Sequence, residues 1–364
     1  MGYPLRCLGE VAEIIAGQSP PGSTYNEARY GLPFFQGKGD FGEVHPVARK
    51  WCSAPNKIAE AGDILISVRA PVGGTNTASE KCCIGRGLAA LRGKSGILDS
   101  RYLLHAMRVV EPILVAKGSG STFQAVGRKD IASLEIPLPP LEEQRHIADL
   151  LDEADRLQRL RKEANGKAQK ILPALFLGMF GDPETNPMGW EIKPLKDVVT
   201  CLDSRRKPVK ASDRALRKGD VPYYGANGQV DWIDEALFDE PLVLLAEDGG
   251  YWGVREKSSY AIVGRSWVNN HAHVLRPTTV TQRFLVEQLN HRDLREYLSG
   301  TTRGKLTKGD MNRITVMVPP RDSMRRFDSI ANDSHLLASQ QSDSGDKLSL
   351  IGATLRSHLF AEVV

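Results

Sequence analysis

The sequence of 364 residues contains little cysteine and no long apolar run. Its five cysteines (Cys7, Cys52, Cys82, Cys83 and Cys201) are odd in number and form no C-x-x-C pair. A disulfide framework or a zinc ribbon is therefore a poor interpretation, and a reducing compartment fits better. No stretch has the length of a membrane span, and the first residues lack the basic-then-apolar form of a signal peptide. These absences predict a cytoplasmic protein.

The excess of positive charge is also small. The net charge is +4 and the pI is about 8.7, less basic than is usual for a protein that coats nucleic acid without specificity. Any contact with DNA should therefore come from local basic patches. The length is sufficient for two domains, each with its own core.

Catalytic signatures are absent as well. The sequence has no P-loop and no glycine-rich loop placed to hold a methyl donor. His271 and His273 lack an apparent third metal ligand, and as alternate residues they fit one face of a strand. Glu247-Asp248 lacks the Glu-x-Lys partner of a nuclease site, and Asp248-Gly249-Gly250 fits a turn. We therefore predict no catalytic residue and no metal site in this chain.

What the sequence does contain is an internal repeat. Residues 119–157 align without a gap on residues 299–337, at an offset of 180. The matched residues include Asp130 with Asp310, Pro139-Pro140 with Pro319-Pro320, and Arg145 with Arg325. Fainter matches extend to the start of each half, where Leu8–Val11 resembles Leu195–Val198, but the offset drifts and the middle of each half barely matches. One scaffold with two different recognition surfaces suits a target that has two halves.

Within each half, a loop-rich region precedes a long helical pattern. The expected strands are Ile64–Val68, Leu88–Leu91, Leu134–Leu138, Leu242–Ala246 and Ala261–Val263. The expected shorter helices are Asp99–Val110, with Asp99 or Ser100 as its cap, and Gln282–Ser299.

From Leu141 to Phe180, apolar residues recur every three or four positions, which predicts a long helix; Gly166 should weaken it and Pro173 should kink it. The second long helix should use the seam Phe327, Ile330, Leu337, Leu348, Ile351, Leu355 and Leu359. Since helices gain most of their stability from tertiary packing, we expect the two to pack against each other as an antiparallel pair. The predicted fold class is α/β (α+β), with two pseudo-symmetric mixed α/β domains separated by a pair of long antiparallel coiled-coil helices.

Two segments resemble the specificity subunit of type I restriction–modification systems. Ile136–Ile147 reads Ile-Pro-Leu-Pro-Pro-Leu-Glu-Glu-Gln-Arg-His-Ile and is similar to the start of the family's first conserved helix; Leu175–Pro183 is similar to its end. The second copy, Val318–Phe327, departs from the pattern because it lacks the Leu-Glu-Glu-Gln core. Together with the repeat, the resemblance covers essentially the whole chain.

The resemblance implies target-recognition domains at 1–140 and 190–320, and conserved helical spacers at 141–181 and 321–364. It implies a non-catalytic, DNA-binding subunit of a restriction system, in which each target-recognition domain reads one half of a bipartite asymmetric sequence in double-stranded DNA. The helices would act as a ruler and bind two methyltransferase (modification) subunits, which methylate adenine with S-adenosylmethionine. Endonuclease/translocase subunits, which use ATP and Mg, would join them for DNA cleavage, and this chain itself would hold no cofactor. The residues that match the family's helix, and would contact the partners, are Leu141, Glu142, Gln144, Arg145, Phe176 and Phe180.

Candidate DNA-binding residues are cations, amides and hydroxyls, which suit phosphates and base edges. In the second half, Arg205, Arg206, Lys207 and Lys210 lie in a basic run, with Tyr223 and Asn227 after it; a solvated charge run and a core tyrosine are the alternatives. In the first half, the candidates are Gln36, Lys38, Arg69 and Arg86, with a plain turn at Gly37–Gly39 as the alternative. The repeated loops add Ser119, Ser121, Thr122 and Arg128, and then Thr301, Thr302, Arg303 and Lys305; both could equally be loops that end helices.

Two other classes of function remain open from the sequence. A stand-alone nuclease or methyltransferase predicts activity from the purified chain, and the missing catalytic residues speak against it. A two-domain protein-interaction scaffold predicts no DNA binding, whereas a DNA reader predicts binding with a steep salt dependence.

Overall fold

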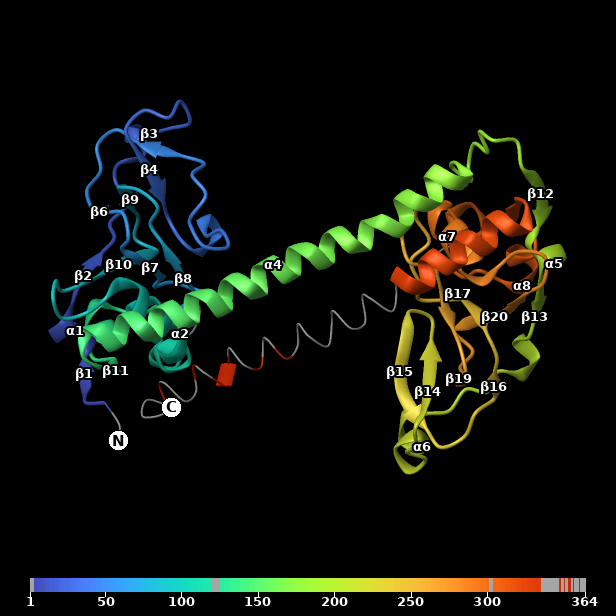
Figure 1. Cartoon of the computed structure of the whole chain (residues 1–364). Helices are drawn as coiled ribbons and strands as arrows, with labels where there is room; N and C mark the ends of the chain where they lie inside the picture. Colours follow the sequence, from blue (N-terminus) through green and yellow to red (C-terminus); the bar gives the residue numbers. More distant parts are fainter. Residues whose placement is uncertain are drawn as a thin grey trace. The chain divides into compact units, whose positions relative to one another are not determined.

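The computed structural model describes residues 3–118, 125–300 and 304–334, together with residues 347, 350, 353, 354, 356 and 360. It divides the chain into unit 1 (residues 1–162 and 343–364) and unit 2 (residues 163–342). Figure 1 shows the elements of each unit. Among the described residues, none of the helices combines the length and the apolar character needed to cross a membrane.

Unit 1 is built on a four-stranded antiparallel sheet with the strand order β2-β10-β7-β8. Its strands are β2 (Ala12–Ala16), β10 (Leu88–Gly93), β7 (Ile64–Ser67) and β8 (Thr75–Thr77). A five-stranded sheet of short strands lies beside it, with the order β3-β5-β4-β9-β6. These strands are β3 (Tyr25–Asn26), β5 (Trp51–Cys52), β4 (Leu32–Phe35), β9 (Cys82–Ile84) and β6 (Ile58–Ala59). Strand β1 (Leu5–Cys7) pairs antiparallel with β11 (Glu135–Pro137), which joins the first strand of the unit to its last.

Helix α2 (Ser100–Lys117) supplies much of the core of unit 1. Its start is fixed by Asp99, whose carboxylate accepts hydrogen bonds from the backbone amides of Arg101 and Tyr102. The predicted apolar face is confirmed, because its members are all buried: Tyr102, Leu103, Ala106, Met107 and Val110. The short helices α1 (Leu8–Val11) and α3 (Arg128–Ala132) contact each other and the edge strand β2.

Unit 2 repeats this plan. Its main sheet has the order β13-β20-β17-β18, made of β13 (Val199–Cys201), β20 (Ala272–Pro277), β17 (Leu242–Ala246) and β18 (Ser259–Ile262). The second sheet has the order β15-β14-β19-β16, made of β15 (Gly228–Ile233), β14 (Val221–Gly225), β19 (Arg265–Val268) and β16 (Phe238–Asp239). The remaining elements are β12 (Glu191–Pro194), α5 (Leu195–Val198), α6 (Ala211–Leu216), α7 (Gln282–His291), α8 (Lys308–Met311) and β21 (Thr315–Val318). The common topology confirms the duplication that the sequence predicts.

Helix α4 (Leu141–Phe180) confirms the long helix between the two α/β regions. It is continuous through Gly166 and Pro173. Its first residues belong to unit 1 and its last residues to unit 2. The predicted seam is only partly right: Ile147 is buried, but Leu150, Leu157, Leu160 and Ile171 are exposed.

Most of the second conserved helix lies outside the described residues. Its start in unit 2 is described, and Phe327 is buried there. Leu337, Leu348, Ile351, Leu355 and Leu359 are not described, so their place in a seam and the antiparallel pairing of the two helices stay predictions. Phe360 is described, and it packs in the core of unit 1 against Tyr102, with ring centroids 5.4 Å apart.

Candidate nucleic-acid interface

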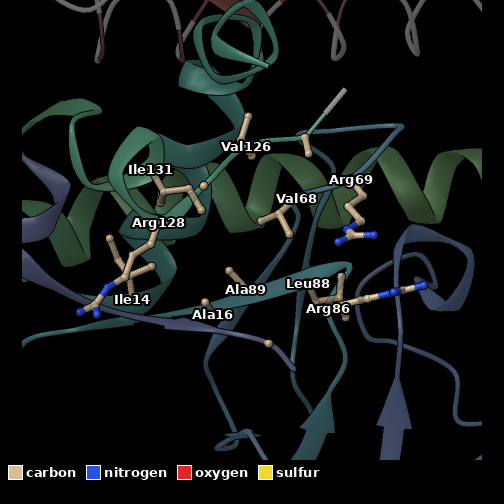
Figure 2. Close-up of a pocket in the computed structure, with 13 residues that line it drawn as sticks. Ile14, Ala16, Val68, Arg69, Arg86, Leu88, Ala89, Val126, Arg128 and Ile131 are labelled. Atoms are coloured by element: carbon tan, nitrogen blue, oxygen red, sulfur yellow. The ribbon is translucent and has the colours of Figure 1, made fainter. Parts of the chain in front are cut away.

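Three of the predicted DNA-binding arginines surround one hollow in unit 1. The hollow measures about 200 Å³, and Arg69, Arg86 and Arg128 line it. Its remaining lining is small or apolar: Ile14, Ala16, Gly17, Val68, Leu88, Ala89, Ala125, Val126, Gly127 and Ile131. Figure 2 shows Arg69 and Arg86 on one side of the apolar residues and Arg128 on the other.

The backbone explains why residues far apart in the sequence meet at this hollow. The chain beyond β7 continues as an extended segment, in which the carbonyl of Val68 accepts a hydrogen bond from the amide of Val126 (3.0 Å). Arg69 forms an isolated antiparallel bridge with Ala125, which brings Arg128 to the same place. Arg86 lies in the turn before β10, beside the backbone of Gln36, and a Cβ atom on Gly87 would lie 2.2 Å from the carbonyl oxygen of Gln36. Glycine at position 87 is therefore needed for this close approach.

The three guanidinium groups of the hollow are available for a ligand. Arg69, Arg86 and Arg128 are exposed, and none of them has a side-chain hydrogen bond or ion pair in the described part of the chain. Lys38 lies nearby and is exposed, with its side chain against Gly74, where an added Cβ would lie 2.7 Å from the lysine Cε. The described candidates of the first half, Gln36, Lys38, Arg69, Arg86 and Arg128, are thus all exposed on unit 1.

The corresponding place in unit 2 carries ionised side chains instead. There the carbonyl of Glu247 accepts a hydrogen bond from the amide of Leu306 (2.8 Å), and Asp248 forms a bridge with Lys305. Strand register makes Glu247 the equivalent of Val68, and it makes Asp203 and His273 the equivalents of Ala16 and Ala89.

These residues of unit 2 form a compact ion-pair network. The Nδ1 atom of His273 lies 2.6 Å from a carboxylate oxygen of Asp203, and its Nε2 atom donates to the carbonyl oxygen of Leu306 (2.8 Å). Arg206 donates to Glu247 (2.7 Å), and Lys305 lies 3.0 Å from the other carboxylate oxygen of Glu247. Each ring nitrogen of His273 therefore faces an oxygen atom of the same unit.

The network lowers the pKa of both carboxyl groups. Burial raises the pKa of Asp203, but its hydrogen bond and ion pair with His273 outweigh burial, and the pKa lies below its ordinary value. Burial acts in the same direction on Glu247, and hydrogen bonds from Arg206 and Lys305 again bring the pKa below its usual range. Both carboxylates are therefore ionised at neutral pH and held by cations of the same unit.

Asp203, Glu247 and His273 also have the composition of a metal site, since their ligand atoms lie within 4.8 Å of one another. Both ring nitrogens of His273 already contact oxygen atoms of the same unit. Arg206 and Lys305 already supply the positive charge that a cation would bring. The arrangement fits a structural network better than a metal centre. His271 lies apart from it, 2.7 Å from Asp248.

The cations of the basic run in unit 2 differ in their exposure and in their partners. Arg206 is largely buried in the network, so the structure does not support DNA contact by its side chain. Arg205 donates to the carbonyl oxygen of Leu237 (2.6 Å) and lies over the ring of Phe238, but it remains partly exposed. Lys207 and Lys210 are exposed, without a side-chain partner among the residues that the structure describes.

Tyr223 was predicted to contact DNA, and this prediction is wrong. The side chain is 1% exposed, packs in the core with Val221, Ile233 and Trp267, and is bound through its hydroxyl to the amide of Val209 (3.0 Å). Asn227 lies in the exposed turn between β14 and β15, where it donates to the carbonyl oxygen of Gly249 (2.9 Å).

Three of the predicted partner contacts are also wrong. Gln144 is fully buried: it donates to the carbonyl oxygens of Ile97 and Pro139 and accepts from the amide of Asp99, so it binds the loop before α2. Phe176 and Phe180 are fully buried in the core of unit 2. A side chain that is fully buried in its own unit cannot contact a partner. Of the predicted partner contacts, Leu141, Glu142 and Arg145 remain.

Six predicted residues lie outside the described part of the chain: Ser119, Ser121, Thr122, Thr301, Thr302 and Arg303. Lys305 is described, and its ammonium group pairs with Glu247.

The sequence did not reveal the network of unit 2 or the apolar lining in unit 1. The offset between the halves is 187 at Ala16 and Asp203, 179 at Val68 and Glu247, and 184 at Ala89 and His273. A gap-free alignment therefore cannot match these residues. Strand register is needed to align Glu247 with Val68, because the middle of each half barely matches in sequence.

Two α/β units of one topology, with different side chains at equivalent positions, define a protein with a duplicated fold. The sequence-family model described as the type I restriction modification DNA specificity domain matches residues 2–169 and residues 187–325. The chain therefore belongs to this family.

Relatives and a solved structure agree with this membership. The putative type I restriction enzyme MjaX specificity subunit of Methanocaldococcus jannaschii is 43% identical over 168 residues, which are 45% of this chain and 40% of that protein. The type I restriction enzyme MjaIX specificity subunit of the same organism is 24% identical over 324 residues, 78% of this chain and 72% of that protein. The crystal structure of the type I restriction-modification system S subunit from M. genitalium has the same fold, with a TM-score of 0.72 and 17% identity over 99% of this chain and 96% of that one. The chain thus spans less than half of the length of the first relative.

Proposed function

We propose that the chain is the specificity subunit of a type I restriction–modification complex and that each unit reads one half of a bipartite, asymmetric DNA target. One observation carries this proposal: the DNA specificity model matches both units, whose main sheets have the same strand order, while equivalent positions carry different side chains. A common scaffold gives both units the same way of docking on a duplex. Different side chains give them different sequences to read.

The proposed contact surface of unit 1 consists of exposed cations and one amide. Its members are Gln36, Lys38, Arg69, Arg86 and Arg128. In unit 2 we propose Lys207, Lys210, Asn227 and the exposed part of Arg205. Cations suit phosphates, whereas the amide and guanidinium groups can also bind base edges. The hydroxyl-rich loops at 119–122 and 301–303 remain proposals for phosphate contact on the strength of their residue types.

We further propose that the exposed start of α4 binds modification subunits. Leu141, Glu142 and Arg145 are accessible there. In this proposal the partners hold S-adenosylmethionine, ATP and Mg, and perform adenine methylation and DNA cleavage. This chain contributes recognition alone and works with them in the cytoplasm.

The decisive test is methylome sequencing of a host that carries the complete system. The expected result is a split asymmetric motif with a methylated adenine in each half. Exchange of residues 1–140 for the same region of a relative with a different motif should change one half of the motif and leave the other half intact. A change of both halves, or of neither, contradicts the proposed division of labour.

A control separates this function from the two rival classes. The purified chain with S-adenosylmethionine should transfer no methyl group, which excludes a stand-alone methyltransferase. It should bind duplex DNA with an affinity that falls steeply as salt rises, which excludes a scaffold that binds only proteins.

A further inference from the structure

The hollow of unit 1 combines positive charge with an apolar floor, and none of its described lining residues is acidic. Arg69, Arg86 and Arg128 are its only charged lining residues in the described part of the chain. Guanidinium groups without a carboxylate partner favour an anion. The apolar residues between them favour a ligand that also has an apolar body (Figure 2).

The residues that line the hollow indicate which part of a nucleic acid could bind there. An extruded base is usually held by aromatic stacking and by hydrogen bonds to its polar edge. The thirteen lining residues that the structure describes include no aromatic, amide or hydroxyl side chain. A deoxyribose with its phosphates fits this chemistry, because the sugar has an apolar face and the phosphates are anions.

We propose that the hollow of unit 1 binds a sugar–phosphate segment of one DNA strand, with the deoxyribose against Val68 and Ala89. One flanking phosphate lies between Arg69 and Arg86, and the next lies at Arg128. This inference rests on the proposed function, since it assumes that unit 1 contacts DNA. It goes beyond that function by assigning these arginines to the backbone, so that they position the duplex and do not read its sequence.

The proposed backbone site belongs to unit 1 alone. In unit 2, the equivalents of Ala16 and Val68 are the carboxylates of Asp203 and Glu247, and a phosphate at the same place would meet both. Their cations, Arg206 and Lys305, are already paired. The two units therefore use the same place in the fold for different purposes: one binds the DNA backbone, and the other stabilises its own structure.

The difference between the units suggests the test. Val68→Glu introduces into unit 1 the residue that unit 2 has at this position, and Val68→Gln has the same shape without the charge. Val68 is only partly buried, so both variants should fold, and thermal melting of each full-length chain checks this. We expect Val68→Glu to weaken duplex binding severalfold at low salt, by an amount that shrinks at high salt. Val68→Gln should weaken binding less than Val68→Glu, and by an amount that changes little with salt, because it removes apolar contact without adding a charge.

The arginines give an independent measurement. Removal of both guanidinium groups on one side, in Arg69→Ala/Arg86→Ala, should weaken binding equally for target and unrelated duplexes. The slope of log K against log salt should fall by up to about 1.8, because each phosphate that the chain neutralises contributes about 0.9 to the slope. The methylated motif of a host with this variant should stay unchanged.

Three results overturn the inference. Equal affinities of the Glu and Gln variants show that no phosphate lies near Val68. An unchanged salt slope in the double-arginine variant shows that these arginines are solvated, and a relaxed motif shows that they read bases. If the natural chain itself binds no DNA, the proposed function fails together with this inference; if it binds DNA normally and one of the three results appears, only the backbone site fails.

Discussion

At the scale of single residues, cations that look alike in the sequence have different roles. Arg206 and Lys207 are neighbours, yet Arg206 is bound to Glu247 and to the carbonyl oxygen of Ala272, whereas Lys207 is exposed. The planar guanidinium group can donate several hydrogen bonds in fixed directions, which suits a buried position between a carboxylate and a carbonyl. A lysine ammonium is more strongly hydrated and remains at the surface.

This difference predicts opposite effects for two adjacent substitutions. Arg206→Ala leaves Glu247 and Asp203 without one of their cations at largely buried positions, and should destabilise unit 2 by about 3–5 kcal/mol. Lys207→Ala should change stability by less than about 0.5 kcal/mol and reduce the salt slope of DNA binding by about 0.9. Chemical denaturation and DNA titration of each variant measure the two effects. Equal stabilities of the two variants would show that the network does not stabilise unit 2.

The same network predicts a dependence of stability on pH. The pKa values of Asp203 and Glu247 lie below their ordinary values of 3.8 and 4.5 in the folded unit. Each carboxylate therefore contributes stability that is complete above its ordinary pKa and is lost as the pH falls through the lowered value. The contribution of these two carboxylates to the stability of unit 2 should be nearly constant between pH 6 and pH 5 and fall below about pH 4.

Asp203→Asn is the matched control for this prediction, because it keeps the shape and removes one titrating group. The stability difference between the natural chain and this variant should be large at pH 6 and shrink as the pH falls. A difference that is constant across the range would show that Asp203 acts through its hydrogen bonds alone.

At the scale of secondary structure, the two units cap the first amides of a helix with different residues. The first amides of α2 are capped by Asp99, the residue directly before the helix. The first amides of α7, on Arg283 and Phe284, donate instead to Asp328, which lies at the start of the second conserved helix. The cap of α7 is thus supplied by tertiary structure, and the repeat preserves the helix without preserving its cap.

Aromatic residues near the ends of the conserved helical segments complete the two cores. Phe176 of α4 packs in unit 2 against Phe284 of α7, with ring centroids 5.6 Å apart. Phe360 occupies the corresponding place in unit 1, against Tyr102 of α2. The core of unit 2 therefore includes Phe176 and the core of unit 1 includes Phe360. Each of these residues lies near the C-terminal end of a conserved helical segment.

Substitution of these phenylalanines should destabilise one unit at a time. Phe360→Ala should destabilise unit 1 by about 3–5 kcal/mol through the reduced burial and the cavity, and Phe176→Ala should do the same to unit 2. Hydrogen exchange measures the effects separately: the amides of α2 should exchange faster in Phe360→Ala, and those of α7 in Phe176→Ala. Exposed Leu150, replaced by Ala, serves as the control. Faster exchange of α7 in Phe360→Ala would contradict the assignment of Phe360 to unit 1.

At the scale of the whole molecule, α4 is the element that belongs to both units. Its 40 residues correspond to a length of roughly 60 Å at about 1.5 Å per residue. Pro173 does not interrupt it. A continuous helix of this length is suited to act as the proposed ruler between the two half-sites.

The proposed ruler predicts the effect of a longer spacer. A duplication of Leu157–Leu160 adds four residues, which extend the helix by roughly 6 Å and rotate its end by about one helical turn. The native half-sites should be kept, while the gap between them should grow by one or two base pairs, since each base-pair step is about 3.4 Å. Methylomes of hosts with the native and the lengthened chain give the comparison. The same half-sites at the same spacing would show that the helices do not set the distance.

By itself, the sequence determined the features that depend on local pattern. The period of apolar residues from Leu141 to Phe180 and the cap at Asp99 predicted α4 and the start of α2, and the gap-free repeat predicted two units of one topology. The tertiary structure alone decided which polar side chains are available. Gln144 binds the loop at Ile97, 47 residues away, and His273 binds Asp203, 70 residues away. Such pairs form only when strands and helices from distant parts of the chain meet. Whether a charged side chain is buried against a partner or stays exposed depends on how much water the folded unit removes from it. No local sequence pattern encodes that burial.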